Sequence, residues 1–341
     1  MEWTRAELKT QAKRFLKTRY WYALLVGFIA CLLGAIGIGT SSPGLSGSSF
    51  NFNGGNVSGL NGASLAVFLV IFVVVFTIAI AVALAYTIFV ASPILVGHHR
   101  WFVNSRRGEP ASKIGLLFSL FKKGEYRGSV AGSAWRLLWS FLWGLPYAVF
   151  AVPTTLLTGL LAFKSVIAVV EAVASRLGRS VDLSGLTQVQ DFLASRLPST
   201  AALLGIMAIL VALSLASLVP VVWKAVSYRM TPWILADNPR IGYRRALDLS
   251  KEMTHGHVFE ILLLALSFLG WYLLARITMP LTCCLPVGPY FLQPYLDATE
   301  SELYAVLKHG AILHGDCTPE ELGYASAPVV GTASAEEGSP A

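Results

Sequence analysis

The stretch Leu65–Ile94 reads LAVFLVIFVVVFTIAIAVALAYTIFVASPI, thirty residues without a charged side chain. It lies inside a longer segment, residues 20–99, in which eighty consecutive positions contain no Asp, Glu, Lys or Arg. A charge at the bilayer centre costs at least about 2.5 kcal/mol, whereas a soluble domain needs surface charges to stay in water. Helices satisfy all their backbone hydrogen bonds internally, so the segment predicts an all-α integral membrane protein.

Further charge-free runs follow, and about 20 residues of helix cross the hydrocarbon layer. We expect a six-span helical bundle within residues 20–307, with spans at about 20–38, 65–94, 137–163, 198–224, 258–275 and 277–296. The last run is interrupted by Pro280, Pro286, Pro289 and Pro294. Broken spans leave backbone carbonyls to be satisfied elsewhere, and transporters use them to line cavities.

The basic residues predict the orientation. Of 26 Lys and Arg residues, 21 fall on one side of the predicted topology, in residues 5–19, 100–136, 224–251 and at Lys308. Cytoplasmic loops carry such an excess, so both termini are predicted to be cytoplasmic. The net charge of +7 follows this topology, and no nucleic-acid partner is predicted.

Amphipathic segments flank the spans on this side. In residues 1–19, Trp3, Leu8, Ala12, Phe15 and Leu16 recur at helical spacing among six cations, which predicts a helix lying on an anionic membrane surface. A basic regulatory arm is the alternative. Residues 308–341 are polar and rich in small side chains, so we expect a disordered cytoplasmic tail.

Small residues line one face of the first span at every fourth position: Ala23, Gly27, Cys31, Ala35 and Gly39. Such a face lets a neighbouring helix approach closely, either within the monomer or across a homo-oligomer. The four cysteines form no disulfide framework, because Cys283 and Cys284 are adjacent, Cys31 lies within a predicted span and Cys317 lies in the polar tail. We expect four free thiols.

Asp237-Asn238-Pro239, after the fourth predicted span, is the most specific local pattern. Asp or Asn at an N-cap followed by proline is typical of a helix start. The pattern predicts an amphipathic helix over residues 243–253 on the cytoplasmic side, ended by Gly256.

With these residues the chain resembles the bacterial integral membrane family known as domain of unknown function 975. The resemblance rests on Asp237-Asn238-Pro239, Ala246-Leu247, Ser250-Lys251-Glu252-Met253, Gly256-His257, Leu266-Ser267-Phe268-Leu269-Gly270-Trp271 and Pro294-Tyr295, with Pro93–Gly97 and Phe118–Phe121 upstream. Residues 279–284 depart from the Gly-rich turn of that family. The resemblance implies a multi-pass protein of the bacterial plasma membrane, without a known activity. More loosely, the chain is similar to the membrane domain attached to some glycerophosphodiester phosphodiesterases, and this similarity implies a lipid-related function.

No sequence motif for catalysis or cofactor binding is present, and no carboxylate lies deep in a predicted span. We therefore expect no enzyme activity, cofactor or metal, although His98, His99, His255 and His257 all lie at one membrane border. Arg276, at the outer end of the fifth span, is the candidate contact for an anion or lipid headgroup.

The expected function is a membrane scaffold or accessory subunit that binds lipid or a partner membrane protein. The alternative is a transporter or permease-like protein for a small or lipidic solute.

Overall fold

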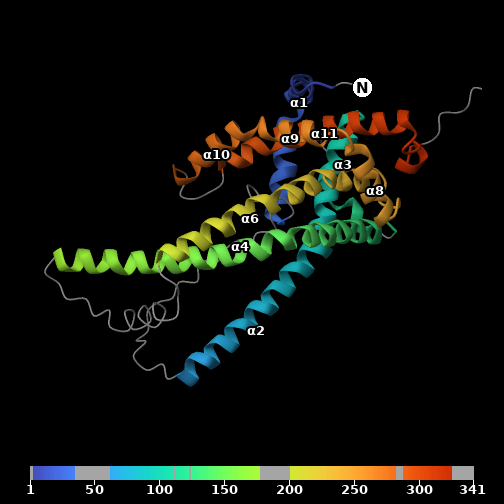
Figure 1. Cartoon of the computed structure of the whole chain (residues 1–341). Helices are drawn as coiled ribbons and strands as arrows, with labels where there is room; N and C mark the ends of the chain where they lie inside the picture. Colours follow the sequence, from blue (N-terminus) through green and yellow to red (C-terminus); the bar gives the residue numbers. More distant parts are fainter. Residues whose placement is uncertain are drawn as a thin grey trace, which may run out of the picture. The chain divides into compact units, whose positions relative to one another are not determined.

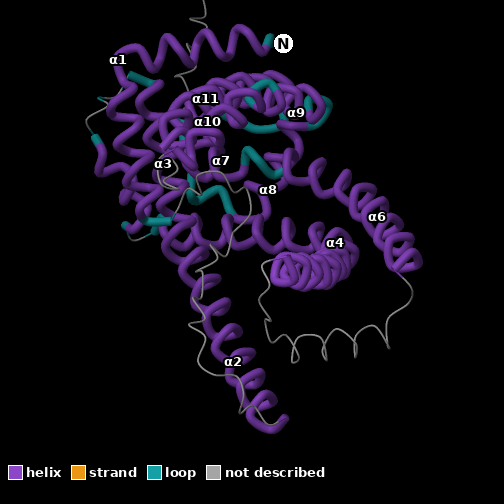
Figure 2. The backbone as a smooth tube through the Cα atoms, turned by 90° about the vertical axis from the view of Figure 1, so that its left-hand side faces the viewer, coloured by secondary structure: helices purple, strands orange, loops and turns teal. Residues whose placement is uncertain are grey.

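The computed structural model describes residues 3–34, 62–108, 110, 113–122, 124–176, 200–281 and 287–324. Every regular element in this part of the chain is helical, as the sequence predicts, and Figure 2 shows the helices joined by loops. The elements, most of them labelled in Figure 1, are α1 (Arg5–Leu32), α2 (Gly62–Tyr86), the π-helical turn η2 (Thr87–Ala91), α3 (Ser92–Arg106), the 3₁₀ helix η3 (Ile114–Phe121), α4 (Tyr126–Arg176), α6 (Thr200–Ser227), α7 (Thr231–Asp237), α8 (Tyr243–Thr254), α9 (Val258–Leu266), α10 (Leu269–Leu281), α11 (Val287–His314) and η4 (Glu320–Leu322). The chain forms two compact units, Met1–Arg136 with Ser227–Ala341 (unit 1) and Leu137–Val226 (unit 2).

Five helical stretches of the described chain are long and apolar enough to cross a membrane. They are Arg5–Leu32, Val70–Arg106, Tyr126–Gly159, Ala201–Asp237 and Val258–Ile277. These stretches overlap the first five predicted spans, and they make the chain a multi-pass membrane protein. Of the predicted sixth span, residues 277–296, the structure describes the end of α10 at Leu281 and the start of α11 at Val287, and residues 282–286 lie outside the described residues. Pro294 lies inside α11 without ending it.

α1 runs without a break through the predicted boundary at residue 19. Its buried positions are four residues apart at Leu8, Ala12 and Leu16, and they resume on the same helix from Ala23 to Ala30. α11 and α3 pack against α1. The prediction that this apolar stripe rests on lipid is wrong for Leu8, Ala12 and Leu16, because protein covers them.

The small-residue face of α1 also packs within the chain. Ala23 and Ala30 are buried, and a Cβ on Gly27 would lie 4.0 Å from Cε1 of His98 in α3. This favours packing within the monomer over a homo-oligomer seam for this part of the face. Ala35 and Gly39 lie outside the described residues.

Two glycines permit close backbone contacts in unit 1. A Cβ on Gly97 of α3 would lie 2.1 Å from the carbonyl oxygen of Leu117 in η3. A Cβ on Gly128 of α4 would lie 1.9 Å from the carbonyl oxygen of Pro239. Any larger side chain at either position would force these segments apart.

The helix after Asp237-Asn238-Pro239 covers the predicted residues 243–253, but the tripeptide does not cap it. α7 ends at Asp237, and α8 begins at Tyr243 after Gly242, whose φ of +92° suits glycine. No side chain caps α8, so the predicted N-cap role of Asp237 or Asn238 is wrong. Asn238 Oδ1 instead accepts the backbone N–H of Arg240 at 3.0 Å, closing a local turn. Gly256, with φ of +82°, follows the end of α8 as predicted.

The chain also remains ordered past residue 308, where we expected a disordered tail. α11 continues to His314, and the segment from Gly315 to Tyr324 folds back onto the loop before α8. Asn238 Nδ2 donates to the Glu321 carbonyl at 2.9 Å, and Arg245 Nε donates to Glu321 Oε1 at 2.5 Å. Residues 325–341 of the predicted tail lie outside the described residues.

Unit 2 consists of the greater part of α4 and α6. Its large apolar side chains are mostly exposed, among them Leu156 at 66% and Val219 at 67%. α4 and α6 contact each other through side chains: Thr158 Oγ1 lies 3.9 Å from Met207 Sδ, and Lys224 Nζ lies 5.0 Å from the centroid of the Trp143 ring. An apolar surface of this extent is typical of helices that face lipid.

Candidate functional site

Polar side chains recur along one face of α11. Gln293, Asp297, Glu300, Tyr304 and Lys308 are spaced three or four residues apart, which places them on the same side of the helix. We call this set the α11 polar stripe. Asp297 is 6% exposed and Tyr304 is 1% exposed. Because a buried polar group costs free energy unless it is paired, the stripe requires partners from other elements.

The first of these partners is His98 of α3. Its Nε2 lies 3.0 Å from Asp297 Oδ2, and the His98 side chain is fully buried. Gln293 Nε2 donates to the other oxygen of Asp297 at 2.9 Å. The ring of neighbouring His99 stacks on Trp233 of α7, with centroids 4.1 Å apart. Among the described residues, neither His98 Nδ1 nor His99 Nδ1 has a hydrogen-bond partner.

The next carboxylates of α11 are paired with arginines. Glu300 forms a salt bridge with Arg229, which lies between α6 and α7. Glu302, beside the stripe, accepts from Nε and Nη2 of Arg106 in α3 at 3.0 and 2.9 Å. Each acid therefore joins α11 to a different part of unit 1.

Asp237 lies at the far end of the stripe, where its carboxylate is fully buried. Oδ1 accepts from Arg107 Nη2 at 2.6 Å, and Oδ2 accepts from the Tyr304 hydroxyl at 2.7 Å and from Lys308 Nζ at 3.2 Å. The Tyr324 hydroxyl lies 3.4 Å from the same oxygen and also contacts Arg107 and Lys308. We call these five residues the Asp237 cluster. Burial, followed by the nearby Asp237 charge, raises the pKa of Tyr304 well above its usual value, so Tyr304 stays a neutral donor.

The other motif residues near Asp237 make backbone contacts. Asn238 binds the Glu321 carbonyl, and the Pro239 carbonyl lies against Gly128. Ser250, fully buried in α8, donates to the carbonyl of Ser227 at 2.8 Å. These contacts tie the loop and α8 to neighbouring segments, and they expose no reactive group.

The remaining predicted residues lie elsewhere. Ser267 lies at the break between α9 and α10, and its carbonyl accepts from Lys9 Nζ at 3.4 Å. Pro294 is buried in α11, and the Tyr295 ring packs edge-on against Phe268 with centroids 5.4 Å apart. Gly270 and Trp271 are exposed on α10, the latter by 56%. Arg276 is exposed on α10 and belongs to neither the α11 polar stripe nor the Asp237 cluster.

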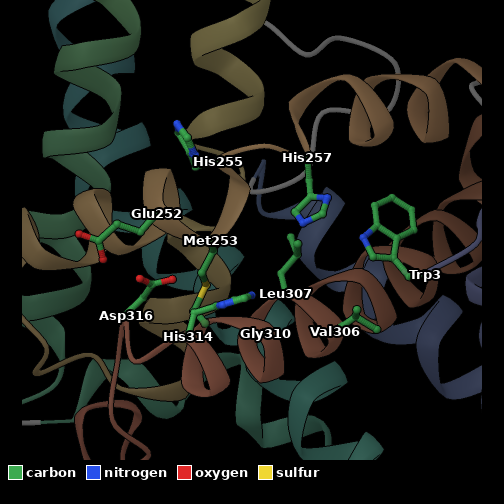
Figure 3. Close-up of a pocket in the computed structure, with 11 residues that line it drawn as sticks. Trp3, Glu252, Met253, His255, His257, Val306, Leu307, Gly310, His314 and Asp316 are labelled. Carbon is green, nitrogen blue, oxygen red and sulfur yellow. The ribbon is translucent and has the colours of Figure 1, made fainter. Parts of the chain in front are cut away.

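The four histidines considered as metal ligands separate into two places. His98 and His99 are buried in α3, whereas His255 and His257 line a cavity of about 480 Å³ formed by the N-terminus, the end of α8 and the end of α11. In Figure 3, His257 lies toward Trp3, while Glu252 and Asp316 lie together on the opposite side of this cavity. Within the described residues, no group of three or more His, Cys, Asp or Glu side chains is placed to hold a metal ion.

The comparison with protein families now identifies the chain's family. Residues 136–310, just over half of the chain, match the model described as "Protein of unknown function (DUF975)". The chain belongs to the DUF975 family. This confirms the resemblance drawn from the sequence. Neither a curated protein nor a solved structure matches the chain.

The DUF975 match contains the α11 polar stripe and Asp237, whereas His98, Arg106 and Arg107 precede it. We missed the stripe in the sequence, because we assigned its first residues to a span and its last to a tail. A signal was present, since polar residues recur from Gln293 to Lys308 at helical spacing. Their partners, up to 199 residues away, left no local signal.

Proposed function

We propose that this DUF975 protein is a six-span bacterial plasma-membrane protein with both termini in the cytoplasm. The large cavity supports an even number of crossings, because it brings together Trp3, His257 and Leu307. These residues precede α1, precede α9 and lie near the end of α11, so all three points are on the same side. If α9 and α10 cross the membrane outward, α11 returns as the sixth span. The excess of basic residues on this side supports its assignment to the cytoplasm.

We infer that the protein acts as a non-enzymatic scaffold or accessory subunit that binds membrane lipid or a partner membrane protein. The observation that carries this proposal is the pairing of the α11 acids. Asp297, Glu300 and Glu302 each contact a basic side chain from another element. Carboxylates held in this way fix the packing of helices, whereas an acid or base catalyst needs a reacting group within hydrogen-bond reach.

Exposed apolar helices support the same proposal. Val70, Val73 and Val82 of α2 are 59–63% exposed, and the most apolar window of this span contains no buried residue. A span uncovered by its own chain must be covered by lipid or by another protein. No cofactor is needed for either role.

The test is native mass spectrometry of the full-length protein purified from its source membrane in mild detergent. Retention of one lipid class or one partner at fixed stoichiometry is the expected result. A matched sample of an unrelated multi-pass protein from the same membrane controls for bulk lipid and common contaminants. A protein that retains nothing beyond this background would contradict the proposal.

The transporter alternative rests on a different observation, the buried pair of His98 and Asp297. Paired His and Asp side chains inside membrane helices serve as proton relays in pumps and transporters. This reading predicts that protein in liposomes supports proton-dependent solute flux and that Asp297→Asn abolishes it. Glu302→Gln is the control, because it removes a paired acid of α11 outside the relay. Absence of flux for a solute that stabilises the protein would remove this alternative.

A further inference from the structure

A second cavity, of about 240 Å³, opens beside the Asp237 cluster between α3 and α11. Its polar lining consists of Arg106, Arg107, Ser301, Tyr304, Lys308 and Tyr324. Three of these side chains carry a positive charge, and the other three carry hydroxyl groups. No carboxylate lines the cavity.

The charges behind the cavity do not cancel those that line it. Asp237 faces both Arg107 and Lys308, while Glu302 pairs with Arg106. Among the described residues, three cations therefore meet two carboxylates, which leaves one positive charge in excess. The carboxylates are 0% and 8% exposed, whereas the arginine side chains are 42% and 40% exposed. The acids thus hold the guanidinium groups from the protein side and leave their outer edges accessible.

Hydrogen-bond donors remain available on these outer edges. Arg106 uses Nε and Nη2 for Glu302, and Arg107 uses Nη2 for Asp237 and Tyr324. Among the described residues, the Nη1 group of neither arginine has a hydrogen-bond acceptor. A guanidinium presents five N–H donors in a planar fork, a geometry that matches phosphate oxygens.

We infer that this cavity binds a phosphate-type anion, supplied either by a phosphomonoester lipid headgroup or by free phosphate. A cation would meet three like charges here, and an apolar ligand would cover the arginine donors without offering them acceptors. The location suits a headgroup, because Arg106 ends the candidate span Val70–Arg106 and so lies at a membrane border. The inference deepens the proposed lipid binding, and its headgroup form rests on that proposal.

The first experiment measures binding of inorganic phosphate to the full-length protein in detergent by isothermal titration calorimetry. Arg106→Gln with Arg107→Gln removes both forks, and Lys13→Gln with Arg14→Gln removes two adjacent exposed cations of α1 as the charge-matched control. We expect the first pair to weaken binding by at least about tenfold, equivalent to about 1.4 kcal/mol, and the control to leave it unchanged. An equal loss in both, or no phosphate binding by the wild type, would overturn the inference.

Ala305→Leu gives a second variant that keeps every charge. Ala305 lines the cavity, so the larger side chain takes up part of its volume while every charged residue is kept. We expect weakened phosphate binding at an unchanged melting temperature. Full affinity in this variant would place the anion elsewhere and refute the assignment even if the arginine variant unfolds.

The two sources of phosphate are separated by competition with a water-soluble, short-chain phosphatidic acid. Displacement of inorganic phosphate assigns the site to a headgroup, and phosphate binding without displacement assigns it to the free anion. The test of this phosphate site can also be distinguished from the test of the proposed scaffold function. Loss of the site with retained partner or lipid refutes only this inference, whereas intact phosphate binding with no retained partner or lipid refutes only the scaffold proposal.

Discussion

Replacing Gly97 by alanine tests the close backbone contact between α3 and η3 in unit 1. The new Cβ would lie 2.1 Å from the carbonyl oxygen of Leu117 and 2.7 Å from its carbonyl carbon. Reaching the 3.0 Å below which Cβ contacts essentially do not occur requires a shift of about 0.9 Å. The obstacle is backbone, so η3 must move with its fully buried side chains Leu117 and Leu120.

Two free-energy terms of opposite sign set the size of the stability change caused by Gly97→Ala. Overpacking a close contact costs about 1–3 kcal/mol, whereas alanine in place of glycine favours a helix by about 1 kcal/mol. The clash makes the net change destabilising, because a backbone carbonyl cannot rotate away as a flexible side chain does. We expect a net loss of stability of up to about 2 kcal/mol in unit 1.

The assay is a thermal scan of tryptophan fluorescence in detergent at one fixed scan rate, since membrane proteins often unfold irreversibly. Trp101 and Trp233 are fully buried in unit 1 and report on its packing. Gly115→Ala is the matched control, because Gly115 lies in η3 with no atom within 4 Å of its added Cβ. The expected result is a melting temperature lowered by several degrees for Gly97→Ala only. Equal melting temperatures for both variants would refute the close-contact argument.

Three further predictions concern the charged and buried groups of unit 1. Asp237→Asn removes the charge that pairs with Arg107 and Lys308. Because these side chains are 42% and 15% exposed and water compensates part of the loss, we expect a cost of about 1–3 kcal/mol in thermal scans. Lys251→Gln, which breaks an exposed pair, should cost less than about 1 kcal/mol. The hydrogen bond from Arg245 lowers the pKa of Glu321, so its stabilising contribution is present above the unfolded value of about 4.3 and is lost as the pH falls through the lower folded value. The difference in melting temperature between wild type and Glu321→Gln should therefore shrink from pH 7 to pH 3.5, and a constant difference would contradict this. Burial raises the pKa of Cys317 to about 11. In a variant with the other cysteines replaced by serine, maleimide should therefore label Cys317 at pH 8 at least about 100-fold more slowly than a free thiol. An ordinary labelling rate would show an accessible thiolate and contradict this prediction.

The sequence predicted the features that depend on local composition. Charge-free runs identified the helical membrane segments, and the apolar spacing of residues 8–16 correctly indicated which face of α1 is buried. It did not indicate what covers that face, because lipid and protein favour the same apolar side chains. For the polar residue Asp237, too, the local sequence did not indicate which side chains would contact it. Its local pattern matched a helix N-cap, but Arg107 and Tyr304, which bind it, lie 130 and 67 residues away.

The tripeptide Asp237-Asn238-Pro239 joins separate segments through three different groups. The Asp237 carboxylate binds α3 and α11, the Asn238 amide binds the Glu321 carbonyl, and the Pro239 carbonyl lies against Gly128. Each of these groups is therefore engaged with another segment of unit 1. The effect of the tripeptide is to fix Arg107, Lys308 and Tyr324 around one buried charge, with their remaining donors at the wall of the smaller cavity. A search for ligands of this protein should therefore begin with anions that fit this cavity.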